Sequence, residues 1–233
     1  MGFSTIRQSV VNKRAAIETA NGNADNTQVT FSLAPSCTSI PLTSVLPTIT
    51  NPIDIKGPGA NKLSLIIQGG EQVFDAYNAS SLKVSGLTLS GGGISNVNDV
   101  NPGTPSTDKI SGVVIKNADL DAVLYFSSTA TNSKVIIENS TFTENNQAVT
   151  NGNGFLSYST NYDLTFRNNT VVNNSFAESM IYVNASSVSV LQSNTFVSNE
   201  SGRIGNSGTA SFDGVNLFGN LISDLDPGLR NGG

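Results

Sequence analysis

Two aspartates, Asp119 and Asp121, are the residues whose type and spacing best suit chemistry. Residues two apart in a β-strand point to the same face, so both carboxylates would lie on one surface. Glycoside hydrolysis requires a pair of carboxyl groups around the scissile bond. Glu138 and Glu144 are the next carboxylates along the chain, and Lys116 is a nearby cation. These residues indicate a polysaccharide-binding or polysaccharide-cleaving site as one hypothesis, with isolated surface acids as the alternative.

Composition excludes several other chemistries. The chain has no His, which removes Ser-His-Asp catalysis, Cys-His catalysis and His-liganded metal sites. The candidate carboxylates do not come with the Asn-Thr-Asp, Asp-Asp and Gly-His-Gly motifs of the polygalacturonase class. The segment Gly91-Gly92-Gly93-Ile94 lacks the Asp of a Gly-Gly-x-Gly-x-Asp calcium loop. We therefore predict no catalytic residue, no metal site and no cofactor.

Charge and hydropathy limit the partners and the location. The chain has 233 residues, with 17 acidic and 12 basic side chains and a net charge of −5. A nucleic-acid partner needs a basic stripe that neutralises phosphates, so nucleic acid is excluded. Since the sequence has no run of about 18 apolar residues, we predict no membrane-spanning segment. Richness in Asn, Ser, Thr and Gly suits a secreted or cell-surface protein, whose signal peptide this chain would have lost. The single Cys37 is expected to be a small core residue.

Seven segments repeat one pattern at intervals of 21 to 31 residues. They begin at Asp54, Lys83, Val114, Ile136, Thr165, Val190 and Ser211. The second position is apolar in every segment: Ile55, Val84, Ile115, Ile137, Phe166, Leu191 and Phe212. The seventh is also apolar: Ala60, Leu89, Leu120, Phe142, Val171, Phe196 and Leu217. The fourth is always Gly, Asn or Ser, which favour turns. Such a period is typical of a solenoid with one coil per repeat.

Each repeat contains about three short apolar patches, several with strand-like alternation. The sequence therefore predicts an all-β fold, a right-handed parallel β-helix of eight to nine coils. Residues 1–24 are expected to form a capping helix, from Ser4 to Ala20, and a turn, and residues 25–233 the β-helix. The polar segment from Asn96 to Asp108 is the longest apparent loop. We expect it to bulge from one coil, where a solenoid places function.

Stacked coils bring equivalent residues about 4.8 Å apart, so repeated polar residues are expected to form ladders. The expected Asn and Thr ladders are Asn145, Asn174, Asn199, Asn220, Thr88, Thr141, Thr170 and Thr195. A further Asn ladder is expected from Asn117, Asn139 and Asn168. Lys116, Glu138 and Arg167 are expected outside the coil as a row of alternating charge, or alternatively as ligand-binding residues with Asp119 and Asp121. An ice-binding Thr face is a weaker alternative, because Asp119 interrupts the Thr row.

The chain resembles a known family. Thr5 to Val10, followed by Ala20 to Asp25, resembles the N-terminal CSLREA motif region of exported bacterial β-helix proteins, although Ser4 stands nearest to the motif's Cys. Phe142-Thr143-Glu144-Asn145 and Phe196-Val197-Ser198-Asn199 match the Phe-x-x-Asn hallmark of polymorphic outer membrane protein repeats, and Gly92-Gly93-Ile94 matches their companion element. The resemblance implies a pectin-lyase-like right-handed β-helix, an adhesin-like surface role and no catalytic residues. Because relatives continue beyond the position of Gly233, it also implies either a fragment truncated there or an unusually short member whose last coil is open.

Two functions follow as hypotheses. The first is a non-enzymatic exported β-helix, a structural or adhesin-like module of the cell surface that stacks end to end with further copies of itself. The second is a polysaccharide-binding or polysaccharide-cleaving β-helix with a groove of acids and aromatics. The aromatics available to such a groove are Tyr125, Phe126, Tyr158, Tyr162 and Tyr182. The expected partners are therefore another copy of the chain or a host-surface or glycan ligand.

Overall fold

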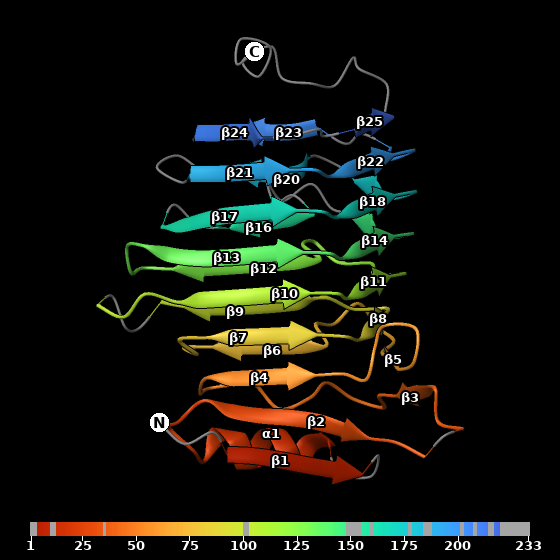
Figure 1. The fold of residues 1–233 in the computed structure, drawn as a ribbon, viewed down its shortest axis with the longest axis vertical. Helices are drawn as coiled ribbons and strands as arrows, with labels where there is room; N and C mark the ends of the chain where they lie inside the picture. The colour runs from red at the N-terminus through yellow and green to blue at the C-terminus, as the bar shows by residue number, and fades with distance from the viewer. Residues whose placement is uncertain are drawn as a thin grey trace.

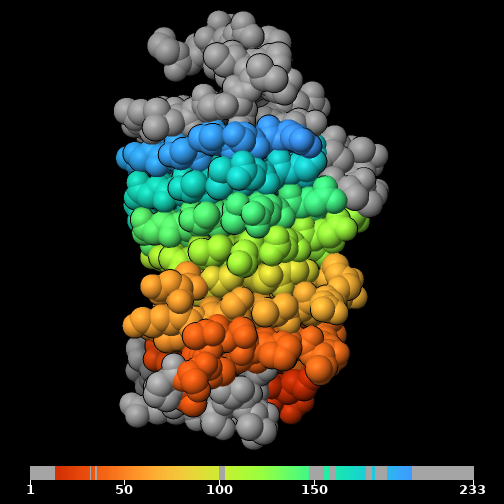
Figure 2. Space-filling model, turned by 90° about the vertical axis from the view of Figure 1, so that its right-hand side faces the viewer, coloured from red at the N-terminus to blue at the C-terminus, as the bar shows by residue number. Residues whose placement is uncertain are grey.

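The computed structural model is a right-handed parallel β-helix with one short helix at its N-terminal end (Figure 1). It describes residues 4–9, 13–34, 36–99, 103–147, 155–158, 161–176, 179–183, 188–200, 203–206, 209–213 and 217–219. Figure 2 shows the coils as successive bands of colour across the long axis. No helix among these residues is long and apolar enough to cross a membrane.

Three parallel sheets form the walls of the coil. Sheet A consists of β1 (Ser4–Ser9), β2 (Thr27–Ser32), β4 (Ile53–Lys56), β7 (Leu82–Ser85), β10 (Thr107–Ser111), β13 (Ser133–Glu138), β17 (Tyr162–Arg167), β21 (Val188–Gln192) and β24 (Thr209–Asp213). Sheet B consists of β3 (Ser39–Pro41), β5 (Ser64–Ile66), β8 (Thr88–Ser90), β11 (Val114–Lys116), β14 (Thr141–Thr143), β18 (Thr170–Val172), β22 (Thr195–Val197) and β25 (Leu217–Gly219). Sheet C consists of β6 (Phe74–Tyr77), β9 (Ile94–Asn98), β12 (Leu124–Ser128), β16 (Leu156–Tyr158), β20 (Ser179–Val183) and β23 (Arg203–Asn206).

The coil count depends on which sheet is counted. In the described part of the chain, sheet A has nine strands and sheet B eight, but the number of complete coils is smaller than the expected eight to nine. Sheet C has six, so six coils contribute a strand to all three sheets. A short two-stranded ladder, β15 (Asn146–Gln147) with β19 (Ser175–Phe176), extends one turn between sheets B and C.

The N-terminal end differs from the expected helix of Ser4 to Ala20. Ser4–Ser9 forms β1 and pairs in parallel with β2 along its whole length, and α1 covers only Lys13–Asn21. Pairing with a neighbouring strand overrides the weak helical pattern of the first residues, since local propensity is a small term. Ala16, Ile17 and Ala20 remain helical and are buried in the core, so the helix does cover the first coil.

The predicted alignment of the second repeat position agrees with the strand register in six segments but is wrong in the third. Ile55, Val84, Ile137, Phe166, Leu191 and Phe212 occupy one register row of sheet A, as expected. The member of that row between Val84 and Ile137 is Ile110, whereas Ile115 lies in sheet B beside Leu89 and Phe142. The seventh position therefore belongs to Ile115 rather than Leu120, and to Leu65 rather than Ala60.

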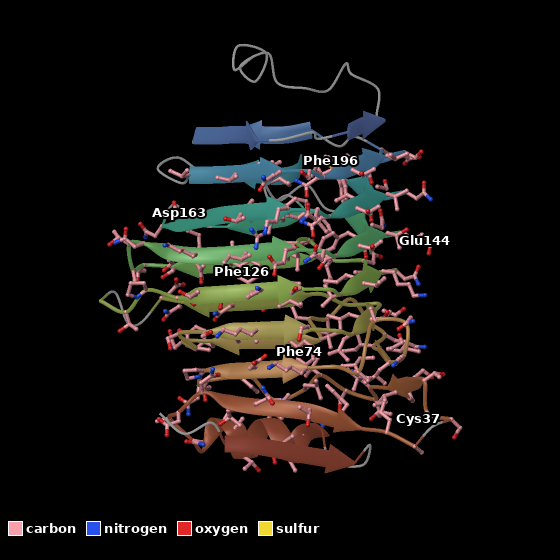
Figure 3. All side chains as sticks on the ribbon, in the orientation of Figure 1. Cys37, Phe74, Phe126, Glu144, Asp163 and Phe196 are labelled. Carbon is pink, nitrogen blue, oxygen red and sulfur yellow. The ribbon has the colours of Figure 1, made fainter. Side chains whose placement is uncertain are left out.

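Aromatic side chains fill the interior of the later coils. Phe142, Phe166 and Phe196 are fully buried and stack at ring-centroid distances of 6.0 and 6.1 Å. Phe74, Phe126 and Phe196 lie within the coil, whereas Glu144 and Asp163 project from opposite edges (Figure 3). Cys37 is half-buried and packs against the core, in keeping with a core role.

Candidate functional site

A groove of about 500 Å³ lies on the outer face of sheet C and contains both candidate aspartates. Its lining residues are Gly70, Gln72, Asp75, Ser95, Val97, Asp119, Leu120, Asp121, Ala122 and Tyr125. They come from three successive coils, and the floor is formed by the outward residues of β6, β9 and β12. Asp119, Asp121 and Tyr125 line one depression, but Asp119 and Asp121 lie in the connection between β11 and β12 and not, as the sequence pattern had predicted, on one strand face.

Three glycines explain how the groove forms. Residues 67–73 connect β5 to β6, and residues 117–123 connect β11 to β12, but the coil between them turns through Gly91, Gly92 and Gly93 alone. A Cβ on Gly92 would lie 2.3 Å from the carbonyl oxygen of Glu71, and one on Gly93 would lie 1.9 Å from that of Val123. The short turn therefore lets the loops of both neighbouring coils approach each other over it.

Direct contacts hold the two loops together. The side-chain amide of Gln72 donates a hydrogen bond of 3.0 Å to the carbonyl oxygen of Ala122. A Cβ on Gly70, whose φ is +70°, would lie 2.9 Å from the carbonyl oxygen of Asp119, so only glycine permits this approach. The walls of the groove are thus fixed by backbone and side-chain contacts within the free chain.

Hydrogen bonds also orient two of the groove carboxylates. Ser95 donates to Asp75 Oδ1 at 2.5 Å, and the two residues are register neighbours on sheet C. Asn146 donates to Asp119 Oδ1 at 3.2 Å from the adjacent coil. Tyr125 follows Ser95 in the same outward row, which places its half-buried ring beside these polar groups.

The other three predicted ligand residues lie elsewhere. Lys116 is in β11 on sheet B, between Ser90 and Thr143, whereas Glu138 and Arg167 are register neighbours on sheet A. The expected row of Lys116, Glu138 and Arg167 was therefore wrong at its first member, because Ser111 occupies that position. Of the other predicted aromatics, Phe126 and Tyr162 are buried, and the side chains of Tyr158 and Tyr182 lie outside the described residues.

Glu138 forms an ion cluster on sheet A. Lys109 Nζ lies 2.6 Å from Glu138 Oε1, and Arg167 donates to Oε2 through Nε at 2.9 Å and through Nη2 at 2.5 Å. Ser111 donates a weaker bond of 3.3 Å. Hydrogen bonds from Lys109 and Arg167 lower the pKa of Glu138 to about 2. The carboxylate is saturated by its own neighbours, so the cluster links three strands rather than offering a ligand site.

We expect Glu138→Gln to lower the free energy of unfolding by about 1 kcal/mol at neutral pH, since both cations are partly exposed and screened by water. The folded pKa lies below the ordinary value, so the ionised group stabilises the fold above about pH 4.5 and loses this effect as pH falls toward 2. Urea unfolding at pH 7 and at pH 3 measures the difference, which should shrink at the lower pH. Asp54→Asn, which alters an ion pair with the exposed Lys56, is the control and should change stability less.

The Asn ladder of the tenth repeat position is present at its three described members. Asn145 is 1 % exposed, and its side-chain amide donates to Asn174 Oδ1 at 3.0 Å. Asn174 in turn donates to Asn199 Oδ1 at 2.8 Å. Asn220 lies outside the described residues. The ladder joins coils in the interior of a turn and has no role in the groove.

The fourth-position Asn residues do not stack as expected. Asn117, Asn139 and Asn168 have φ values of 53–54° and are exposed at the outside of their turns. Asn117 also belongs to a different turn, the one after sheet B. The buried ladder at this corner uses the following residues instead: Asn194 Oδ1 accepts from both nitrogens of Asn169, whose own Oδ1 accepts from the backbone of Ser140.

The Thr ladder lies on the outer face of sheet B. Thr141, Thr170 and Thr195 are direct register neighbours, and Val114 separates them from Thr88. Asp119 does not interrupt this row, contrary to expectation, because it lies beyond the strand in the groove. Thr141, Thr170 and Thr195 are half-buried, whereas Thr88 is buried.

A buried polar cluster inside the coil escaped sequence analysis. Asp108 is 0 % exposed and accepts hydrogen bonds from the backbone of Leu82, from Asn96, from Ser106 and from Tyr162, the last at 2.7 Å. Burial raises the pKa of Asp108 to about 6, against the effect of these donors. The expected bulge of Asn96 to Asp108 is therefore wrong at both ends, which belong to β9 and β10 and point inward.

Comparison with known proteins adds no relative: no family model, curated protein or solved structure matches the chain. Among the described residues, no group of three or more Cys, Asp or Glu side chains is arranged to hold a metal ion. The groove on sheet C is consequently the feature on which a functional assignment depends.

Proposed function

We propose that the chain is a non-enzymatic, exported binding module, an adhesin-like β-helix that contacts a glycan through the groove on sheet C. The observation that carries the proposal is the groove itself, about 500 Å³ in volume and bounded by two loops that contact each other. The stacked coils supply a rigid support, because each wall strand is paired with a strand of the neighbouring coil. Export is supported by the low share of charged residues, 12 %, and by the richness in Asn and Ser.

The lining suits a saccharide. Sugars present hydroxyl groups at their edges and apolar C–H faces, so their sites combine hydrogen-bonding side chains with an aromatic surface. Asp75, Ser95 and Asp119 supply polar atoms, and Tyr125 with Val97 supplies an apolar surface on the floor. All of these side chains come from strands or from loops fixed by neighbouring contacts, which reduces the entropy lost on binding.

The positions of the carboxylates favour binding over cleavage. Asp119 and Asp121 belong to one loop and therefore to one wall, whereas a glycosidase places its two carboxyl groups around the scissile bond. A general acid needs a pKa raised toward neutrality. Burial raises the pKa of Asp108 to about 6, but this carboxyl faces the interior of the coil and contacts Tyr162 rather than the groove.

Replacement of Tyr125 by alanine tests the groove. We expect binding to glycans, detected first on a glycan array and then measured by calorimetry, to weaken at least about tenfold, since loss of an aromatic anchor costs about 1.4 kcal/mol or more. Tyr77→Ala is the matched control, because Tyr77 is 45 % exposed on the same face of sheet C but does not line the groove.

Equal effects of the two tyrosine variants would contradict the assignment of the groove. Release of reducing ends from any bound glycan would instead support the alternative, a polysaccharide-cleaving β-helix. End-to-end stacking of copies stays an expectation from the sequence; β1, at the N-terminal edge of sheet A, pairs only with β2 among the described strands and would be the surface involved.

A further inference from the structure

The interior of the coil is polar at the corner where sheet C leads into sheet A. Asn96 and Asn98 of β9 are 0 % and 1 % exposed. They point inward, because they alternate along the strand with Ser95 and Val97, which line the groove. Asp108 of β10 is fully buried at the same corner. Buried polar atoms of native proteins have hydrogen-bond partners, so each oxygen and nitrogen at this corner requires one.

The amide nitrogens of both asparagines have acceptors. Asn96 Nδ2 donates to the carbonyl oxygen of Ala79 at 3.0 Å and to Asp108 Oδ1 at 2.9 Å. Asn98 Nδ2 donates to the carbonyl oxygen of Thr104 at 3.2 Å. These acceptors fix which end of each amide is the nitrogen, because an amide turned by 180° would place its oxygen against another oxygen.

The amide oxygens of the same two residues are different. Asn96 Oδ1 and Asn98 Oδ1 are buried, and neither accepts a hydrogen bond from a residue that the structure describes. A buried acceptor without a donor destabilises the folded state, because it has given up its hydrogen bonds to water. The fold therefore favours a small hydrogen-bond donor beside these two oxygens.

We propose that this corner binds an internal water molecule that donates hydrogen bonds to Asn96 Oδ1 and Asn98 Oδ1. A water molecule has two O–H donors, which equals the number of acceptors, and internal waters characteristically satisfy such buried polar groups. The two residues are neighbours on one face of β9, about 6.6 Å apart along the strand, and their side chains can bring the oxygens within reach of one bridging molecule.

Small side chains surround the proposed water. Asn96 lies between Ala76 and Phe126 in its inward row of sheet C, and Ala76 is fully buried. Asn98 lies beside Ser128, which is also buried. Phe126 fills the interior of the next coil (Figure 3). Ala76 and Ser128 leave space for a molecule of the size of water, which larger side chains at these positions would fill.

A neutral donor suits the site better than a metal ion. Hard cations such as Ca²⁺ bind six or more oxygen ligands, and carboxylates supply most of their charge compensation. Asp108 is the carboxylate at this corner, but both of its oxygens already accept hydrogen bonds, from Leu82, Asn96, Ser106 and Tyr162. The neutral amide oxygens are thus left to a ligand that donates hydrogens and carries no charge.

A high-resolution crystal structure of the full chain tests the proposal directly. We expect an ordered water peak within hydrogen-bond distance of both Asn96 Oδ1 and Asn98 Oδ1. In solution, the side-chain amide protons of both residues should show NMR cross-relaxation with a water of long residence time. Crystals soaked in rubidium chloride provide the alternative, because an anomalous peak at the site would identify a monovalent cation and overturn the assignment of water.

The variant Asn98→Leu removes one of the two acceptors at nearly unchanged volume. We expect it to abolish the cross-relaxation between water and the Asn96 amide, since the bridging molecule loses half of its partners. Asn61→Leu, which changes an exposed asparagine in a turn, is the control and should leave that signal unchanged. Circular dichroism establishes that each variant is folded.

Three results would overturn the inference. The first is a wild-type protein without a water peak and without water cross-relaxation at either amide, a result that does not depend on the folding of any variant. The second is a crystal structure in which a protein group donates to both amide oxygens. The third is an unchanged signal at Asn96 in folded Asn98→Leu, which would exclude a bridge between the two residues. Glycan binding in the groove is measured separately and is not affected by these outcomes.

Discussion

Replacement of Asn174 by alanine is expected to lower the free energy of unfolding by about 3 kcal/mol, because one side chain satisfies polar groups on three coils. Its Oδ1 accepts from the backbone and the side-chain nitrogen of Asn145. Its Nδ2 donates to the carbonyl oxygens of Phe142 and Val172 and to Asn199 Oδ1. Asn174 is 1 % exposed, so water cannot replace these partners without opening the turn. Urea unfolding followed by circular dichroism measures the change.

The neighbouring Asn173 provides a matched control for this prediction. Asn173 is exposed and has a φ of 55°, a left-handed conformation in which glycine is at least as stable as asparagine. Asn173→Gly should therefore change the free energy of unfolding by less than about 0.5 kcal/mol. A loss below about 1 kcal/mol for Asn174→Ala would show that the Asn ladder contributes little to stability. The aromatic stack beside the ladder would then be the main source of stability in these turns.

Two pairs of adjacent asparagines show which ladder residues the sequence repeat could predict. In the pairs Asn168-Asn169 and Asn173-Asn174, the first residue adopts the left-handed conformation and the second points inward. The sequence pattern identified the inward residue at the turn after sheet B, because Asn recurs there in four successive segments, as Asn145, Asn174, Asn199 and Asn220. At the turn from sheet A to sheet B, the pattern selected the outward residue instead, because Asn, Gly and Ser all tolerate that conformation. The inward residue at this turn does not repeat, since it changes from Leu87 and Val113 to Ser140 and Asn169.

The architecture was predictable because apolar rows repeat, and the misalignment of one coil has an identifiable cause. In β10 the inward position beside Leu82 and Val135 is Asp108, so the strand Thr107–Ser111 resembles a polar loop in sequence. The next apolar patch, Val113 to Ile115, was therefore assigned to sheet A although it belongs to sheet B. Because Asp108 is an acidic residue at a core position, the strand that contains it was not recognised in the sequence. Lys116 was therefore assigned to a row of sheet A, although it lies in sheet B.

The groove was predictable only in part, for a similar reason. Asp119, Asp121 and Tyr125 lie close together in the sequence, so their proximity follows from local spacing. The opposite wall, with Gly70 and Gln72, comes from a coil two turns away along the axis. This wall can approach the other only because Gly92 and Gly93 have no side chain beyond the α-carbon. A repeat pattern predicts a turn at these glycines but does not predict that two loops meet over them.

Asp108→Asn is expected to make the protein more stable at pH 8, by about 2 kcal/mol, and no less stable at pH 4. Burial raises the folded pKa of Asp108 from its ordinary value of 3.8 to about 6. The folded state therefore binds the proton more tightly, and the stability present below about pH 4 is lost as pH rises through 6. A shift of this size corresponds to about 3 kcal/mol at most, of which asparagine recovers a large part.

The geometry of the cluster accommodates the amide. Oδ1 of residue 108 accepts from two pure donors, the backbone N–H of Leu82 and the side-chain amide of Asn96. Oδ2 accepts from the hydroxyl groups of Tyr162 and Ser106, and a hydroxyl can accept a hydrogen bond as well as donate one. An asparagine with its nitrogen in the Oδ2 position would thus keep a partner for each of its polar atoms, at unchanged volume.

Chemical unfolding of the wild type and of Asp108→Asn from pH 4 to pH 8 measures this effect. The wild type should lose stability across the interval around pH 6, and the variant should be flat there, since Glu138 acts with the opposite sign and only below about pH 4.5. Asp163→Asn is the control: residue 163 follows Tyr162, projects from the edge of the stack and keeps an oxygen for the backbone of Val188 (Figure 3). Two results would contradict this prediction: a free energy of unfolding that still falls around pH 6 in Asp108→Asn, or a variant less stable than the wild type at pH 8. Either would show that the four hydrogen-bond donors stabilise the buried carboxylate more than its burial destabilises it.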